Sequence, residues 1–181
     1  MQKIGLIGGL SWISTAVYYQ RLNEITQANL GGVHSALIVM ESIDRQDYVD
    51  AAIEQADENA VSAQIFKAVQ NVERAGADFV VISCNDVHRF VPKIAPKIKI
   101  PFLHIAEVVA TSIQAAGLSA IGLLGVRKTM ESAFYPEIFS TYGIKIILPM
   151  DDERNYIHDK FIMNWFWGSL QIKLATDIWI L

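Results

Sequence analysis

The chain has 181 residues, of which 52% are hydrophobic and 19% are charged, and its formal net charge is −4 at pH 7. There is no basic block, so a nucleic-acid partner is not expected, and no apolar run is long enough to cross a bilayer. A single cysteine excludes an internal disulfide and is typical of the reducing cytoplasm, where we expect the protein. The N-terminus also lacks the long apolar region and cleavage site of a signal peptide.

Strands and helices alternate along the chain, which predicts an α/β fold with parallel sheets and flanking helices. Apolar runs predict strands at about 3–7, 34–40, 79–83, 100–105, 120–124 and 144–148. Helical patterns lie between them, from Ser11 or Ser14 to Gly31, at 48–75, after Asp86, and at 107–116, 129–141 and 152–167. The first helix is expected to turn five side chains toward a core: Ala16, Val17, Tyr18, Leu22 and Ile25.

Two of these helices contain residues that disturb a regular helix. The segment Asp57-Glu58-Asn59 predicts an interruption of the long 48–75 helix. Pro92 and Pro96 predict that the helix beginning near Asp86 is short or kinked, because proline lacks the N–H that a helix interior needs.

A short pattern occurs twice in the sequence. Ile4-Gly5-Leu6-Ile7-Gly8-Gly9 recurs as Ile121-Gly122-Leu123-Leu124-Gly125-Val126. One interpretation of the repeat is that any two buried strands have similar sequences. The other is that the chain consists of two pseudo-symmetric lobes, residues 1–104 and 105–181. The same offset places the counterpart of Cys84 beyond Leu181, so we expect the second lobe to be incomplete.

Cys84 stands at an abrupt change of polarity. It follows the apolar run 77–83 and precedes Asn85, Asp86 and His88. Ligands of open α/β sheets bind just beyond the carboxyl ends of strands, where backbone N–H groups and a helix start favour a thiolate. The alternative is that a lone cysteine is a small core side chain.

Other residues are candidates for binding. The Gly8–Gly9 turn is compatible with an anion site or with a turn that needs positive φ. Arg45 is either a carboxylate-binding guanidinium or a solvated side chain between acidic neighbours. His88 follows Cys84 by four residues, and we favour a helix-face histidine over a Cys/His pair. The four histidines and one cysteine show no metal-ligand spacing.

The C-terminal part of the chain is strongly apolar. Trp165-Phe166-Trp167 and the tail 174–181 predict packing in a core or against a second copy, so we expect a homodimer.

Several of these motifs together resemble the aspartate/glutamate racemases, which are cofactor-independent amino-acid racemases. The similarity covers about residues 1–160. The matching segments are 4–12 with Ser14, Thr15 and Tyr19; 76–79 leading to Cys84, Asn85 and His88; 100–101 with 104–106; and 122–125 with Thr129 and Met130. The segment 44–48 resembles the loop that carries the carboxylate-binding arginine in some members.

The resemblance implies an isomerase that removes and returns the Cα proton of an acidic or related amino acid, without a cofactor. Two thiols, one from each lobe, are understood to act on opposite faces of the substrate in this family. Cys84 matches the thiol of the first lobe, and Asn85 matches the adjacent amide that orients the substrate. The substrate-binding residues implied for an amino acid or dicarboxylate are Gly9, Leu10, Ser11, Arg45, Asn85, Asp86 and Thr129.

The chain also departs from the family pattern. Asp86 replaces the usual threonine after Cys-Asn, and such a carboxylate is expected to repel an anionic substrate and raise the thiol pKa. Val126 replaces a hydroxyl residue, and the second motif, Gly-Cys-Thr-Glu, does not occur. We therefore expect a weak or inactive racemase. A non-catalytic amino-acid or dicarboxylate-binding protein and a single-thiol decarboxylase or isomerase remain as alternatives.

Overall fold

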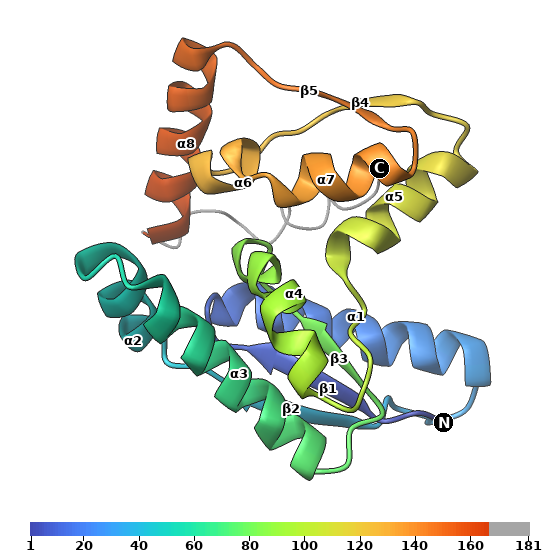
Figure 1. Ribbon diagram of the computed structural model, residues 1–181. Helices are drawn as coiled ribbons and strands as arrows, with labels where there is room; N and C mark the ends of the chain where they lie inside the picture. Colours follow the sequence, from blue (N-terminus) through green and yellow to red (C-terminus); the bar gives the residue numbers. More distant parts are fainter. Residues whose placement is uncertain (167–181) are drawn as a thin grey trace. The chain divides into compact units, whose positions relative to one another are not determined.

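The computed structural model describes residues 1–166, with side chains as far as residue 161 (Figure 1). The chain divides into two compact units, Met1–Ile105 and a second unit that begins at Ala106. Both units are built on parallel strands, as the alternating sequence pattern predicts. Within residues 1–166, none of the helices has both the length and the apolar character required to pass through a bilayer.

The first unit contains a three-stranded parallel sheet of order β2-β1-β3. The strands are β1 (Ile4–Gly8), β2 (Ile38–Ser42) and β3 (Phe79–Ile82), and Leu6 in the central strand pairs with Met40 and Val81. The helices α1 (Trp12–Leu30) and α3 (Glu58–Arg74) lie on opposite faces of this sheet (Figure 1). Both crossovers are expected to be right-handed. The connection from β1 to β2 moves along the sheet in one direction and the connection from β2 to β3 in the other, so their helices lie on opposite faces.

Helix α3 contributes one apolar face to the core of the first unit. Its buried side chains recur at helical spacing and pack against the sheet: Val61, Ile65, Ala68, Val69 and Val72. A Cβ added at Gly5 of β1 would lie 2.8 Å from Val72 Cγ2, so glycine permits this close approach of helix and strand. The core therefore holds β1 firmly, and with it the turn at its carboxyl end.

The predicted interruption of the long helix is confirmed. The segment consists of α2 (Arg45–Val49), a π-helical turn η1 (Asp50–Glu54) and then α3, whose N-cap is Asp57. The Asp57 carboxylate accepts hydrogen bonds from Asn59 N at 2.9 Å and Ala60 N at 3.0 Å, as expected of a strong helix cap.

The proline-containing segment is also short and irregular, as predicted. It forms a 3₁₀ turn η2 (Asp86–Phe90), a single helical turn α4 (Val91–Ile94) and a second 3₁₀ turn η3 (Ala95–Lys97). Pro92 and Pro96 occupy first-turn positions, where the missing N–H costs nothing.

One expectation for this unit is wrong and a second is wrong in part. The segment 100–105 is not a strand, since only Phe102 forms an isolated bridge, to Val80, and Pro101 cannot donate to a ladder. Helix α1 buries its apolar side chains less than expected: Val17, Tyr18 and Leu22 are half-buried, whereas Ala16 and Ile25 are exposed. Its single buried residue is Thr15. A 19-residue helix is about 28 Å long whereas a five-residue strand spans about 17 Å, so α1 extends past the sheet.

The second unit is built on two parallel strands, β4 (Ala120–Gly122) and β5 (Lys145–Ile147). Its helices are α5 (Ile105–Ala115), α6 (Arg127–Glu131), α7 (Phe134–Thr141) and α8 (Asp151–Phe166). The helix expected at 129–141 is split, because Ser132 has an extended backbone.

A small aromatic core holds the second unit together. The rings of Phe134 and Tyr135 lie 4.3 Å apart, and Tyr135 meets Phe139 edge to face at 5.5 Å. Ala106, Ala110 and Ile144 complete this buried cluster. The side chains of Trp165-Phe166-Trp167 and the tail 174–181 lie outside the described residues.

Candidate active site

The carboxyl ends of the three parallel strands bring most of the predicted site residues of the first unit to one edge of the sheet. Ile7 pairs with Ile82, so the turn after β1 and the turn after β3 are neighbours. The backbone N–H of Ser83 donates to Ile7 O at 2.9 Å, and Ile43 N donates to Gly8 O at 3.0 Å. Gly9, Cys84 and the loop leading to Arg45 therefore share this edge, as ligand sites of open α/β sheets do.

The turn after β1 requires glycine. Gly9 has φ +88°, and a Cβ there would lie 2.1 Å from Ile43 O and 2.6 Å from Ile43 N. Ser11 caps α1 by accepting from Ser14 N at 3.4 Å. Leu10 and Ser11 are only 3% and 4% exposed, so their backbone groups are better placed than their side chains for binding a substrate.

Thr15 joins the two turns; the sequence named it as part of the family resemblance but not as a site residue. Its Oγ1 accepts from Gly9 N at 3.0 Å, donates to Ser11 O at 2.9 Å and lies 3.0 Å from Ser83 Oγ. The Ser83 hydroxyl also reaches Ile7 O at 3.2 Å. This buried hydroxyl pair fixes the turn after β1 against the residue that precedes Cys84. Its sequence signals are its place in the family resemblance and its position in the first turn of a helix that follows a glycine pair.

Cys84 is half-buried, and its environment keeps it protonated. Burial and the Asp86 carboxylate raise the pKa of the Cys84 thiol to about 11. The backbone N–H groups of Val87 and Asp86 lower it, as expected for the start of a helical turn, and the positive charge of Arg89 also lowers it, but these effects are outweighed.

Two phenols lie close to the thiol. The pKa of Tyr18 is raised by burial and by the charge of Cys84. The pKa of Tyr48 is raised by burial, then by Asp86, and in smaller part by Cys84. Both hydroxyls therefore remain protonated at neutral pH, and that of Tyr48 donates its proton to Asp86 Oδ2 at 2.6 Å.

His88 supports the turn that carries Cys84. It is 1% exposed, and its Nδ1 lies 2.8 Å from the carbonyl oxygen of Cys84, so we infer that this nitrogen carries the proton. Burial and the neighbouring His104 lower the pKa of His88 to about 4, and the two rings meet edge to face with centroids 5.0 Å apart. His88 is thus a neutral, buried side chain of the helical turn η2.

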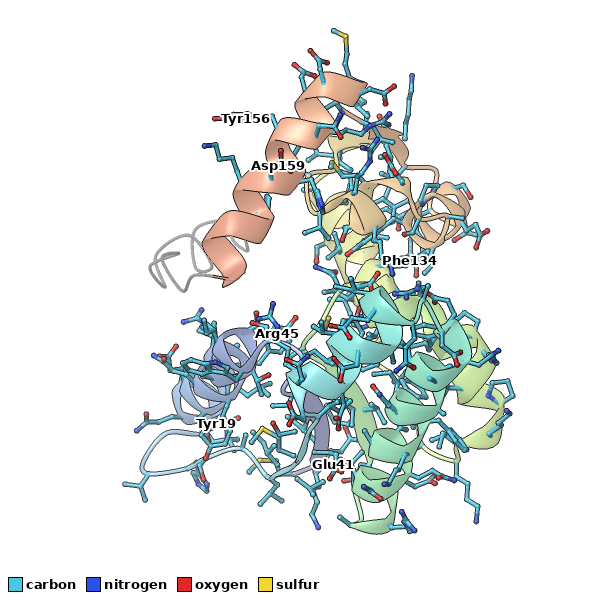
Figure 2. All side chains as sticks on the ribbon, turned by 90° about the vertical axis from the view of Figure 1, so that its left-hand side faces the viewer. Tyr19, Glu41, Arg45, Phe134, Tyr156 and Asp159 are labelled. Carbon is cyan, nitrogen blue, oxygen red and sulfur yellow. The ribbon has the colours of Figure 1, made fainter. Side chains whose placement is uncertain are left out.

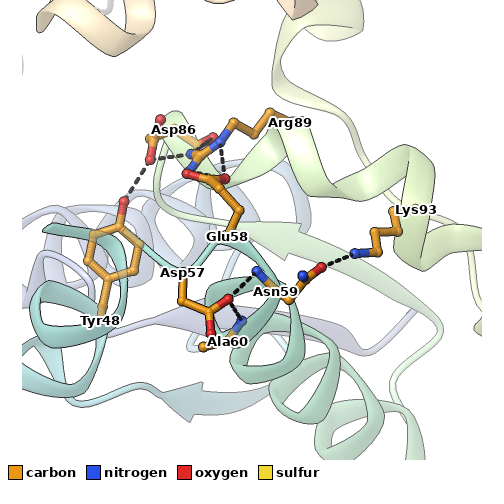
Figure 3. A network of polar contacts seen from close by, with 8 residues as sticks. All are labelled: Tyr48, Asp57, Glu58, Asn59, Ala60, Asp86, Arg89 and Lys93. Carbon is orange, nitrogen blue, oxygen red and sulfur yellow. Dashed lines mark hydrogen bonds and ion pairs between the residues drawn. The ribbon is translucent and has the colours of Figure 1, made fainter. Parts of the chain in front are cut away.

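Asp86 is held by a phenol from α2 and by a guanidinium from its own turn (Figure 3). Tyr48 Oη donates to Asp86 Oδ2 at 2.6 Å, and Arg89 forms an ion pair with the same carboxylate. Arg89 is in turn bound by Glu58 of α3. The carboxylate beside the thiol is therefore charge-compensated, which weakens the repulsion of an anionic substrate that the sequence predicts.

Replacing Asp86 by asparagine is expected to lower the pKa of the Cys84 thiol by about one pH unit, because a nearby negative charge is removed. The thiolate fraction at pH 8 then rises about tenfold, and since a thiolate of lower pKa is a weaker nucleophile, alkylation by iodoacetamide accelerates about threefold. Cys84 is the only cysteine, so mass spectrometry of the intact chain follows the reaction directly. An exposed carboxylate of α2 supplies the control, Asp47→Asn, whose rate should match the native chain; an unchanged rate in Asp86→Asn would contradict the charge argument.

The remaining predicted residues have different surroundings. Arg45 is half-buried at the first position of α2, after Asp44, which caps the helix by accepting from Gln46 N at 2.8 Å (Figure 2). Asn85 is half-buried beside Cys84. Thr129 belongs to α6 of the second unit, where it is 7% exposed and packs near Gly125. In the part of the chain that the structure describes, no three His, Cys, Asp or Glu side chains are grouped to hold a metal ion.

A sequence model of the Asp/Glu/Hydantoin racemase family matches residues 7–161. The chain belongs to this family. A curated relative, the broad specificity amino-acid racemase RacX of Bacillus subtilis (strain 168), is 24% identical over 147 residues, which are 80% of this chain and 63% of RacX. The chain thus spans less than two thirds of the length of that family member.

Solved structures of family members have the same fold. A putative Asp/Glu racemase from Yersinia pestis is 36% identical, with a TM-score of 0.82 over 87% of this chain and 69% of the other. An aspartate racemase homologue from Pyrococcus horikoshii OT3 is 25% identical, with a TM-score of 0.79 over 97% of this chain and 76% of the other. The α/β fold expected from the sequence is therefore confirmed.

Proposed function

We propose that Cys84 exchanges the Cα proton of an acidic or related amino acid, in a reaction that uses no cofactor. The observation that carries this proposal is the position of Cys84 at the carboxyl end of β3, beside the Gly8–Gly9 turn. Membership of the racemase family supports it, and the RacX relative is named as a broad specificity amino-acid racemase.

In the proposed reaction the thiolate of Cys84 removes the Cα proton, and the electron pair of the C–H bond moves toward the substrate carboxylate. The guanidinium of Arg45 binds this carboxylate and stabilises the charge that develops on it. The thiol formed in this way swaps its proton with water, and the same sulfur then returns a proton to Cα, so the substrate is regenerated with a hydrogen taken from the solvent. Because the thiol acts from one face, this step exchanges the proton and retains the configuration.

Inversion requires a second base on the opposite face of the substrate. Cys84 is the only cysteine of the chain, so the two-thiol scheme of the family is not available to it unaided. We therefore propose that racemisation by this chain is weak or absent, and that proton exchange is its main activity.

The raised pKa of Cys84 favours a second candidate function. A thiol that is neutral at pH 7 is a better proton donor than base. In a single-thiol decarboxylase, a malonate-type substrate loses CO2, the resulting carbanion takes the proton of the thiol, and the thiolate regains a proton from water. Release of CO2 from such a substrate, lost in Cys84→Ala, distinguishes this reaction from amino-acid exchange.

The proposed function is tested by incubating L-aspartate and L-glutamate with the chain in D2O and following the loss of the Cα proton by NMR. Replacing Cys84 by alanine is expected to slow exchange by about 100-fold or more, since it removes the group that transfers the proton. Exchange should also accelerate about tenfold for each pH unit from pH 7 toward the thiol pKa of about 11, because the thiolate fraction rises in that proportion.

A matched variant at an exposed hydroxyl, Ser35→Ala, is expected to exchange at the native rate. Chiral analysis of the same samples separates the outcomes. Exchange with retained configuration supports one-base chemistry, and inversion lost in Cys84→Ala identifies a complete racemase. Saturable binding of aspartate with no exchange contradicts the enzymatic proposal and favours a binding protein.

A further inference from the structure

A carboxylate lies two residues after the candidate base, in a position where its charge opposes catalysis. The side chain of Asp86 is only 12% exposed, so water screens it poorly. A thiolate on Cys84 and the carboxylate of an amino-acid substrate are both repelled by it. A site that contains this residue therefore needs a positive charge close by.

Arg89 supplies that charge. It lies one helical turn after Asp86, its side chain is 17% exposed, and it forms an ion pair with the Asp86 carboxylate. Its Nη1 also donates to the backbone oxygen of Asp86 at 2.9 Å. One guanidinium thus contacts both the side chain and the main chain of the same residue, which fixes the turn that follows Cys84.

Arg89 is itself bound by Glu58, which lies outside this turn. Glu58, the first residue of α3, receives two bonds from Nη2, at 2.9 and 3.0 Å, and one from Nε at 3.2 Å (Figure 3). Such fork-like pairing restricts the orientation of the guanidinium. Tyr48 of α2 holds the other side of Asp86, with its hydroxyl 2.6 Å from Oδ2.

We propose that Arg89 is a positioning residue that acts through Asp86, compensating its charge and holding it in place beside Cys84. This inference rests on the proposed function, in which Cys84 is the acid–base group. The titratable and charged side chains of this unit that act on the thiol are the phenols of Tyr18 and Tyr48, which stay neutral, and the charged pair Asp86 and Arg89. Without Arg89, Asp86 becomes an uncompensated and less firmly held anion next to the sulfur.

The test is the rate of alkylation of Cys84 by iodoacetamide as a function of pH. In Arg89→Gln the reaction at pH 8 is expected to slow about threefold, the net result of a tenfold smaller thiolate fraction and a more nucleophilic thiolate. In Arg89→Lys, which keeps the charge but loses the fork, the slowing is expected to be smaller. The matched control is Arg21→Gln, which removes an exposed arginine paired with Glu24 at the same (i, i+3) spacing and should leave the rate unchanged.

The double variant Asp86→Asn with Arg89→Gln separates an action through Asp86 from a direct effect on the thiol. When Asp86 is already asparagine, loss of Arg89 is expected to slow alkylation clearly less than in the native chain. Equal slowing in both backgrounds overturns the proposal, and so does a native rate in a folded Arg89→Gln variant. If circular dichroism shows that Arg89→Gln does not fold, the rate of Arg89→Lys decides: slowing supports the proposal and a native rate overturns it.

This measurement needs no turnover and no substrate. A chain that shows the expected alkylation rates but no isotope exchange refutes the proposed function and leaves the role of Arg89 intact. A chain that exchanges protons, but whose alkylation rate does not change when Arg89 is replaced, refutes the role of Arg89 and leaves the proposed function intact.

Discussion

Replacing Gly9 by alanine is expected to lower the free energy of unfolding of the first unit by about 3 kcal/mol or more. Two separate penalties add at this position. The backbone has φ +88°, which a residue with a Cβ adopts with strain. The new Cβ would also lie 2.1 Å from the backbone oxygen of Ile43, and backbone cannot move aside as a flexible side chain does.

Denaturation in urea, followed by circular dichroism, measures this change. Gly31 offers a matched control, because it also has positive φ, +75°, but a Cβ there meets nothing within 4 Å. Gly31→Ala is therefore expected to show only the conformational penalty, about 1 kcal/mol. If both variants are destabilised equally, the contact with Ile43 is not the cause and the argument for Gly9 fails.

Replacing Thr15 by valine is expected to lower the free energy of unfolding by about 2–3 kcal/mol. Valine has nearly the same shape, so the change isolates the hydroxyl. That hydroxyl is bonded to Gly9 N, Ser11 O and Ser83 Oγ in a buried position. Without it, the N–H of Gly9 is buried with no acceptor, and such a group costs more than the bond that it loses.

Two controls accompany Thr15→Val in the same denaturation experiment. Thr15→Ser keeps the hydroxyl and loses a methyl group, so it is expected to cost about 1 kcal/mol. Thr111→Val changes an exposed threonine of α5 whose hydroxyl donates only to Glu107 O at 2.9 Å, and its effect is expected to be within about 0.5 kcal/mol. A Thr15→Ser variant less stable than Thr15→Val would show that packing, and not hydrogen bonding, dominates at this site.

Local chemistry explains which features of the fold were predictable. The break before α3 depends on Asp57, which caps the next two N–H groups, and the irregular segment after Cys84 depends on Pro92 and Pro96. These residues act on neighbours within one helical turn, so their effect can be read from the order of residues. The strand expected at 100–105 is wrong because this segment pairs with β3 only at the bridge between Phe102 and Val80, and Pro101 has no N–H to donate to a ladder.

The exposed side of α1 could not be predicted for a different reason. Its apolar residues recur at helical spacing, which indicates a face but not what covers that face. The extent of the sheet beneath the helix depends on the lengths of β1, β2 and β3, and only part of α1 lies over them.

By itself, the sequence determined the α/β class, the resemblance to the racemases, and the placement of the single thiol at a strand end followed by polar residues. Those conclusions depend on periodicity, on glycine and proline, and on a motif of consecutive residues. Only the tertiary structure decided what surrounds the thiol. Thr15 meets Ser83 across 68 residues, Tyr48 meets Asp86 across 38, and Glu58 meets Arg89 across 31. Strand order and helix placement bring these partners together, and neither is encoded in the spacing of residues along one element.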